Sequence, residues 1–328
     1  MALTTAPPQA PQTQQPEQPE PIRRRRVLLS RLDLKVSPYL YILPFFVVFA
    51  IFGAYPMFRT LYMSFFDWDL ANARFDPPVF IGLDNYKRML SDPYYWNAMR
   101  NTFGVFLLAT IPQLALALLI AALLNRPFLK AKTFFRIAIL MPNATSVTAV
   151  GIIFLTMFKD TGVINWALGL IGIGPIDWHG DGGFWSYWVA VATMVDWRWT
   201  GYNALILLAG MLAIPRDLYE SAAIDGANAW RQFWSVTFPM LRPTFLFVSI
   251  VAIIGGLQLF TEPVIYTYGY TVRGGDQREV QTLTMYMYEN SMVSFNNAGY
   301  GAAISWSLFL LIIVASIGNF LLIRRTAR

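Results

Sequence analysis

The sequence lacks cysteine and contains a single histidine, His179. Without cysteine the chain forms no disulfide and no thiolate metal site, and one histidine builds no metal cluster by itself. We therefore expect no metal site and interpret His179 as a loop residue near a membrane interface. The dipeptide Gly-Lys is also absent, so the chain has no G-x-x-x-x-G-K-[ST] loop for cradling nucleotide phosphates.

Charged residues are scarce, at 13% of 328 residues, whereas 56% are hydrophobic and 16% aromatic. A soluble domain rarely combines so few charges with so much apolar surface, so an integral membrane protein is the leading class. The formal net charge is +6. The basic residues flank the apolar runs rather than forming one patch, which argues against nucleic acid as a partner.

Six apolar runs are long enough to cross a bilayer, whose hydrocarbon core of about 30 Å takes about 20 helical residues. We therefore predict an all-α polytopic membrane protein with six transmembrane helices and both termini on one side. Pro142, in the third run, lacks the N–H that a helix uses, which predicts a kink there. The runs cover residues 38–66, 101–125, 137–158, 184–214, 243–262 and 299–323.

Lys and Arg concentrate in the N-terminal segment, in the loops after the second and fourth runs, and in the C-terminal tail. The positive-inside rule places these segments in the cytoplasm. We expect a multi-pass protein of the bacterial plasma membrane, in contact with lipid, with both termini cytoplasmic.

Three regions follow from this organisation. Residues 1–36 are predicted to be a disordered Pro/Gln-rich cytoplasmic tail that ends in a basic anchor and lacks the apolar core of a cleavable signal peptide. Residues 37–100 hold the first transmembrane helix and an extracytoplasmic loop. Residues 101–328 form the core, with five transmembrane helices and a cytoplasmic loop at 215–240.

That cytoplasmic loop has the pattern of a short helix, a bend and a second helix. Pro215 suits the start of a helix, and Asp217 and Glu220 place negative charge in its first turn. Gly226 interrupts the helix before the chain returns to the membrane. The pattern alone leaves two interpretations: an amphipathic helix on lipid headgroups, or a knob whose small residues let a partner protein approach.

The stretch YESAAIDGANAWRQFWSVTFPMLRP resembles the EAA motif of binding-protein-dependent ABC importer permeases, with Ser221 in place of the first alanine. The similarity extends over nearly the whole chain from about residue 38 and follows the maltose-importer-like carbohydrate permeases, as in YPMFRTLYMSFFDW and WRWTGYNALILLAGMLAIPRDLYE. The positions that match the motif are Glu220, Ala222, Ala223, Asp225, Gly226, Ala227 and Pro239.

The resemblance implies a type I ABC importer permease fold and the role of transmembrane permease subunit in an ATP-driven importer of di- or oligosaccharides. It implies a homologous second permease, an extracytoplasmic sugar-binding protein, and two cytoplasmic ATPase subunits that bind ATP and Mg²⁺ and receive the EAA loop. Closure of the ATPases would then rock the permeases between inward- and outward-facing states. This chain would have no cofactor and no catalytic residues of its own.

Sugar recognition requires hydrogen-bonding groups for hydroxyls and flat aromatic faces for the C–H surfaces of the ring. In the maltose-importer permease that this chain resembles, the corresponding two spans supply the sugar contacts. We therefore expect Trp199, Tyr202 and Asn203 of the fourth run, and Gln258 of the fifth, to line the path. Gly255 and Gly256 either permit close helix approach or leave room beside a ligand.

Charges near the outer ends of the same two runs leave two interpretations open. Arg198 pairs with Asp196 or Glu262 to close an outer gate, or the three are solvated at the interface. The alternative function is a secondary sugar transporter or channel not driven by ATP, which usually places carboxylates at the bilayer midplane. The first, second, third and sixth runs carry no mid-span carboxylate, which disfavours it. An intramembrane enzyme is disfavoured because no nucleophile with a nearby base, and no metal cluster, is apparent.

Overall fold

The computed structural model describes residues 24–69, 77–126, 128–180, 183–267, 272–293 and 297–325. The predicted disorder before Arg24 lies outside the described residues. The chain forms two compact units, Met1–Phe58 and Arg59–Arg328.

The first unit is helical throughout its described part. Helix α1 (Arg24–Phe49), the π-helical turn η1 (Ala50–Ala54) and helix α2 (Tyr55–Met63) follow one another directly, and α2 crosses the unit boundary. The segment Val36–Met63 is long and apolar enough to cross a membrane. Because α1 begins at Arg24, most of the basic anchor that was predicted as tail is helical, as its Arg, Leu and Lys residues favour.

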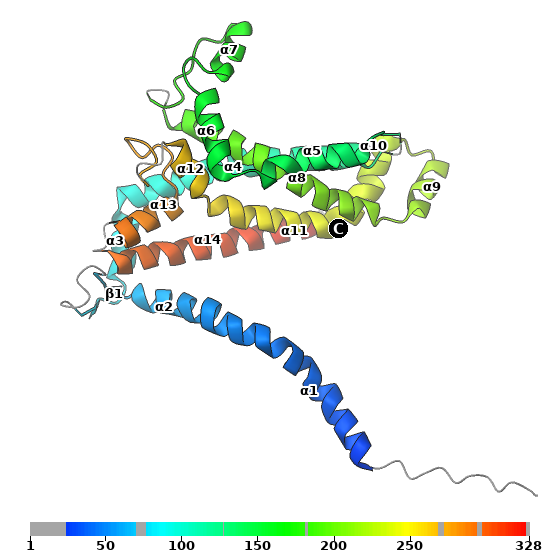
Figure 1. The fold of residues 1–328 in the computed structure, drawn as a ribbon, viewed down its shortest axis with the longest axis horizontal. Coiled ribbons are helices and arrows are strands. Elements are labelled where there is room, and N and C mark those ends of the chain that lie inside the picture. Colours follow the sequence, from blue (N-terminus) through cyan, green and yellow to red (C-terminus); the bar gives the residue numbers. More distant parts are fainter. Residues whose placement is uncertain are drawn as a thin grey trace, which may run out of the picture. The chain divides into compact units, whose positions relative to one another are not determined.

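Long helices dominate the second unit and run alongside one another (Figure 1). They are α4 (Pro93–Leu124), α8 (Phe184–Leu212), α11 (Phe238–Leu257) and α14 (Ala298–Arg325). Small residues allow their close packing. A Cβ on Gly201 of α8 would lie 1.7 Å from the carbonyl oxygen of Ile139, so α8 meets α5 (Lys132–Ala144) almost backbone to backbone.

The third predicted span is broken, so the prediction of one kinked helix was wrong. Helices α5 and α6 (Val147–Met157) meet at 91°. The break follows Pro142 by three residues, at Thr145, whose backbone is extended (φ −78°, ψ 145°). The break lets α6 leave the direction of α5 and pack against α12 (Thr261–Tyr266).

Four helical segments in the described part of the chain are long and apolar enough to cross a membrane, and the bent α5–α6 pair makes a fifth. Helix α8 has 29 residues, which is sufficient length. Its mean hydropathy is lower than that of the other crossing segments, because it contains Trp, Tyr and two charged residues. The six predicted crossing segments therefore correspond to α1–α2, α4, α5–α6, α8, α11 and α14.

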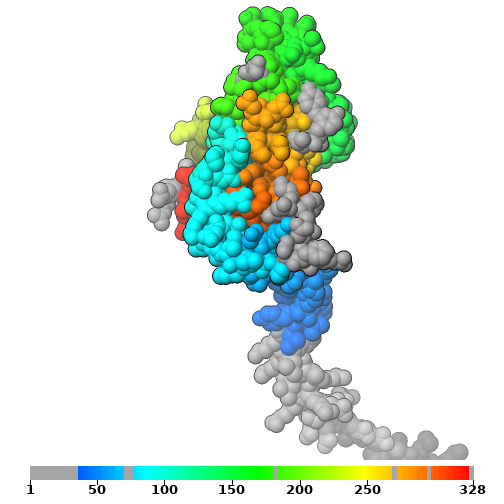
Figure 2. All heavy atoms as spheres, turned by 90° about the vertical axis from the view of Figure 1, so that its left-hand side faces the viewer, coloured from blue at the N-terminus to red at the C-terminus, as the bar shows by residue number. Residues whose placement is uncertain are grey.

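Short elements gather at one end of the second unit, where α3 (Asp84–Ser91) lies against α14 and α4 lies against α13 (Leu283–Tyr288), cyan against orange in Figure 2. Asp92 caps α4 and accepts hydrogen bonds from the hydroxyls of Tyr286 and Tyr300. Other elements are a two-stranded antiparallel ribbon of β1 (Phe66–Asp67) and β2 (Val79–Phe80), helix α7 (Val163–Leu170), and the π-helical turn η3 (Glu289–Val293).

Candidate functional site

A cavity of about 250 Å³, here called the central cavity, lies between α4, α8, α11 and α12. All four residues predicted to contact sugar line it: Trp199, Tyr202, Asn203 and Gln258. Trp199 and Tyr202 are three residues apart and so share a face of α8. Their rings meet edge to face, with centroids 5.8 Å apart. Trp197, on the same helix, lies outside the cavity and packs its ring on Phe154.

The polar residues of the central cavity differ in how exposed they are to a ligand. Gln258 caps the C-terminus of α11 and its side chain is exposed. Asn203 is only 5% exposed, and its amide nitrogen donates to Oε1 of Gln113 on α4 at 3.1 Å. Asn203 therefore orients Gln113, which also lines the cavity. The sequence reasoning missed Gln113, although a glutamine inside an apolar span signals a functional or pairing role.

The sequence left open whether Gly255 and Gly256 of α11 permit close helix packing or leave room for a ligand, and the structure gives each glycine a different one of these roles. A Cβ on Gly256 would lie 2.8 Å from Cδ2 of Phe106 and 2.9 Å from Oγ1 of Thr110, so Gly256 permits close approach to α4. A Cβ on Gly255 would have no atom within 4 Å. Gly255 lines the central cavity and leaves room there.

The charged residues near the central cavity are paired across two helices. Arg198 Nη1 of α8 donates to Oε1 of Glu262 on α12 at 2.5 Å, and the two side chains are only 12% and 9% exposed. The interpretation of all three charges as solvated at the interface was therefore wrong for this pair. Asp196 is not Arg198's partner, and its Oδ1 is buried without a hydrogen bond to any described residue.

At the opposite end of the second unit, residues 215–240 form the predicted helix, bend and second helix. Helix α9 (Arg216–Ile224) ends at Asp225, and Gly226 follows with a φ of +78°. The N–H of Gly226 donates to the carbonyl of Ala223, and that of Ala227 to the carbonyl of Ala222. This pair of bonds is a Schellman motif, which requires a left-handed residue at the Gly226 position.

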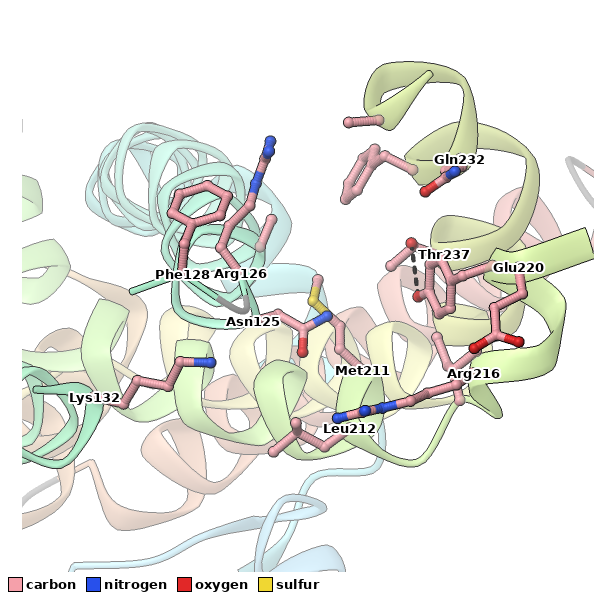
Figure 3. Close-up of a pocket in the computed structure, with 15 residues that line it drawn as sticks. Asn125, Arg126, Phe128, Lys132, Met211, Leu212, Arg216, Glu220, Gln232 and Thr237 are labelled. Carbon is pink, nitrogen blue, oxygen red and sulfur yellow. Dashed lines mark hydrogen bonds between the residues drawn. The ribbon is translucent and has the colours of Figure 1, made fainter. Parts of the chain in front are cut away.

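The chain then turns back through α10 (Ala229–Gln232) and the π-helical turn η2 (Phe233–Thr237) into α11. Asn228 caps α10 by accepting from the N–H of Arg231. The Tyr219 hydroxyl shares a hydrogen bond with the Thr237 hydroxyl at 2.9 Å, which attaches α9 to η2 (Figure 3).

Helix α9 presents small and apolar residues to the outside. Ile224 is 87% exposed, and Ala223, Asp225 and Gly226 are exposed too. Ala222 and Ala227 are half-buried under the turn. A protruding, sharply capped helix with a small-residue surface suits docking into a groove on a partner protein.

The family model described as "Binding-protein-dependent transport system inner membrane component" matches residues 103–328. The chain belongs to this family. The permease is 36% identical to the lactose transport system permease protein LacF of Rhizobium radiobacter, over 89% of this chain and 96% of that protein. It is 35% identical to the arabinooligosaccharides transport system permease protein AraP of Halalkalibacterium halodurans, over 86% of each chain.

Solved structures agree with the family's fold. A bacterial ABC transporter involved in the import of the acidic polysaccharide alginate contains a chain that superposes with a TM-score of 0.68, at 19% identity, over 92% of this chain and 99% of that one. The permease is therefore a membrane component of a carbohydrate ABC importer, with a polytopic helical fold.

Proposed function

We propose that this permease carries an uncharged di- or oligosaccharide through the central cavity. The observation that carries the proposal is the convergence of two aromatic rings and an exposed amide on one cavity: Trp199, Tyr202 and Gln258. Aromatic faces fit the C–H surfaces of a sugar ring, and a few placed polar groups fix its orientation.

The charges of the central cavity support an uncharged substrate. Among the described residues that line it, Glu262 is the only charged side chain, and it forms an ion pair with Arg198. An acidic sugar would meet a carboxylate and no free cation, whereas recognition of carboxylate or phosphate favours Arg.

The partners proposed for the permease follow its family. A second, homologous permease completes the path, and a sugar-binding protein delivers the substrate from outside. One related structure is described as a complex with an alginate-bound periplasmic protein. The α9 end and both termini lie in the cytoplasm, where Glu220, Ala222, Ala223, Asp225, Gly226 and Ala227 couple the permease to two ATPase subunits, which hold ATP and Mg²⁺.

The experiment is to copurify the native complex in lipid nanodiscs and measure which sugars, presented with the binding protein, stimulate ATP hydrolysis. Uncharged disaccharides are expected to stimulate, and uronate or phosphate sugars are not. Trp199→Ala should abolish stimulation. Trp197→Ala also removes a tryptophan side chain from α8, but one outside the cavity, so this variant should retain sugar-stimulated ATP hydrolysis. Stimulation by acidic sugars alone, or equal loss in both variants, would refute the proposal.

Coupling has its own test at Gly226. Alanine there enters a left-handed backbone with no neighbour to clash with, at a cost of roughly 1–2 kcal/mol. Gly226→Ala should therefore distort the end of α9 and reduce copurification of the ATPase. Gly172→Ala is the matched control, since Gly172 has a φ of +80° and equally open surroundings beyond α7. If ATPase recovery is the same for both variants, α9 is not the docking element.

A further inference from the structure

A second cavity, larger than the central cavity and separate from it, lies behind α9. This α9 pocket has a volume of about 670 Å³. It opens between α9, α10 and η2 on one side and the ends of α4 and α8 with the start of α5 on the other. Its lining residues come from segments up to about a hundred positions apart, so the sequence did not predict it.

Part of the lining is apolar. Met211 and Leu212 at the end of α8, Ile214 just after it, and the rings of Phe128 and Phe233 all line the pocket. Such a surface accommodates acyl or aromatic groups. It does not by itself identify a ligand.

Three basic residues also line the same pocket. Arg126 follows α4, Lys132 begins α5 and Arg216 begins α9. None of the three forms an ion pair within the described part of the chain, and Glu220 is the only acidic residue of the lining. In Figure 3 Lys132 and Arg216 extend toward each other from opposite sides of the pocket, whereas Arg126 points away.

Like charges that converge in a concave site repel each other and raise the local concentration of anions. The amide of Asn125 lies beside the space between Lys132 and Arg216 and offers neutral hydrogen-bond donors (Figure 3). Arg and Lys are the residues that recognise phosphate groups, through directed N–H donors and a point charge respectively. The pocket thus combines a phosphate-binding pair of cations with a neighbouring apolar surface.

We propose that the α9 pocket binds a phosphate-bearing anion, with the phosphate between Lys132 and Arg216 and an apolar portion against Leu212 and Phe233. The phosphate comes from an anionic phospholipid headgroup or from a soluble phosphate ester. A ligand held by both cations joins α9 to α5. Any effect of this link on coupling to the ATPase rests on the proposed function of α9, whereas the binding itself does not.

The test uses the full-length permease without its ATPase, so its outcome is independent of transport. One arm counts phosphatidylglycerol molecules retained by native mass spectrometry after delipidation from mixed phosphatidylglycerol and phosphatidylcholine nanodiscs. The other arm measures the shift in thermal midpoint caused by phenyl phosphate in nanodiscs of phosphatidylcholine alone. Retention in the first arm identifies a lipid, and a shift in the second identifies a soluble ester.

The informative variant is Lys132→Gln with Arg216→Gln, which should weaken whichever probe binds by on the order of tenfold or more, because hydrogen bonds to charged groups are lost. The matched control is Lys130→Gln with Arg231→Gln, which removes two exposed charges outside the lining and should bind normally. Exchanging the cations, Lys132→Arg with Arg216→Lys, should preserve binding and show that the fold tolerates change there. Failure of the wild type to bind either probe, or equal binding by the glutamine variant, overturns the proposal.

Discussion

Arg198 and Glu262 form a shielded ion pair that joins two helices across the edge of the central cavity. Arg198 Nη1 lies 2.5 Å from Oε1 of Glu262, and neither side chain is more than 12% exposed. Glu262 also lines the cavity. The pair therefore connects the stability of the α8–α12 contact with the shape of the proposed sugar path.

Replacing one partner of this pair should destabilise the permease. Glu262→Gln leaves the Arg198 charge shielded and without its counter-charge, and removing one member of a buried pair costs roughly 3–5 kcal/mol. Thermal unfolding in nanodiscs should show a clearly lower midpoint. Adding Arg198→Gln should recover part of the loss, because no unpaired charge remains.

The control for this prediction is an exposed pair. Asp84 and Lys87 lie 2.8 Å apart with side chains 61% and 77% exposed. Asp84→Asn should change the midpoint little, because solvent screens such pairs. An unchanged midpoint for Glu262→Gln would show that solvent reaches Arg198 after all.

The adjacent glycines of α11 should respond in opposite ways to the same substitution. Gly255→Val extends into the open central cavity, so it should reduce sugar-stimulated ATP hydrolysis while the unfolding midpoint stays near that of the wild type. Gly256→Val collides with Phe106 and Thr110 and should lower the midpoint, since overpacking typically costs about 1–3 kcal/mol. Equal effects on both readouts would contradict the division of roles between the two residues.

Features that depend on neighbouring residues could be predicted from the sequence. The helix and bend of the α9 region follow from Pro215, Asp217 and Gly226, because capping is decided within a few residues. Trp199 and Tyr202 share a helix face by their spacing alone. Long apolar runs likewise predicted α4, α11 and α14.

Features that depend on contacts between residues distant in the chain could not be predicted from the sequence. Pro142 signals a disturbance in the helix, but the 91° angle between α5 and α6 is accompanied by packing of α6 on α12, more than a hundred residues away. The Asn203–Gln113 bond joins residues 90 positions apart. Neither partner of such a contact carries a sequence signal that identifies the other.

His179 should make the stability of the permease depend on pH. It lies between α7 and α8, where its ring stacks on Tyr266 with centroids 4.7 Å apart. Burial lowers the pKa of His179 below its ordinary value of 6.5, and Lys159 lowers it further, against the opposing effect of Asp160 and Asp177. Burial dominates, so the folded protein prefers the neutral imidazole.

The sign of the effect follows from the depressed pKa. Near pH 7.5 His179 is neutral in both the folded and the unfolded chain and adds no pH dependence. As pH falls below about 6.5 the unfolded chain takes up the proton first, so stability declines until the pH passes the lower folded pKa. The contribution of His179 to the unfolding midpoint, measured by tryptophan fluorescence, should therefore fall between pH 7.5 and pH 5. His179→Phe keeps a ring against Tyr266 without a titrating group, so the midpoint of the wild type should decline relative to that of this variant across the interval. Identical slopes for the two proteins would mean that His179 is as solvated in the folded chain as in the unfolded one.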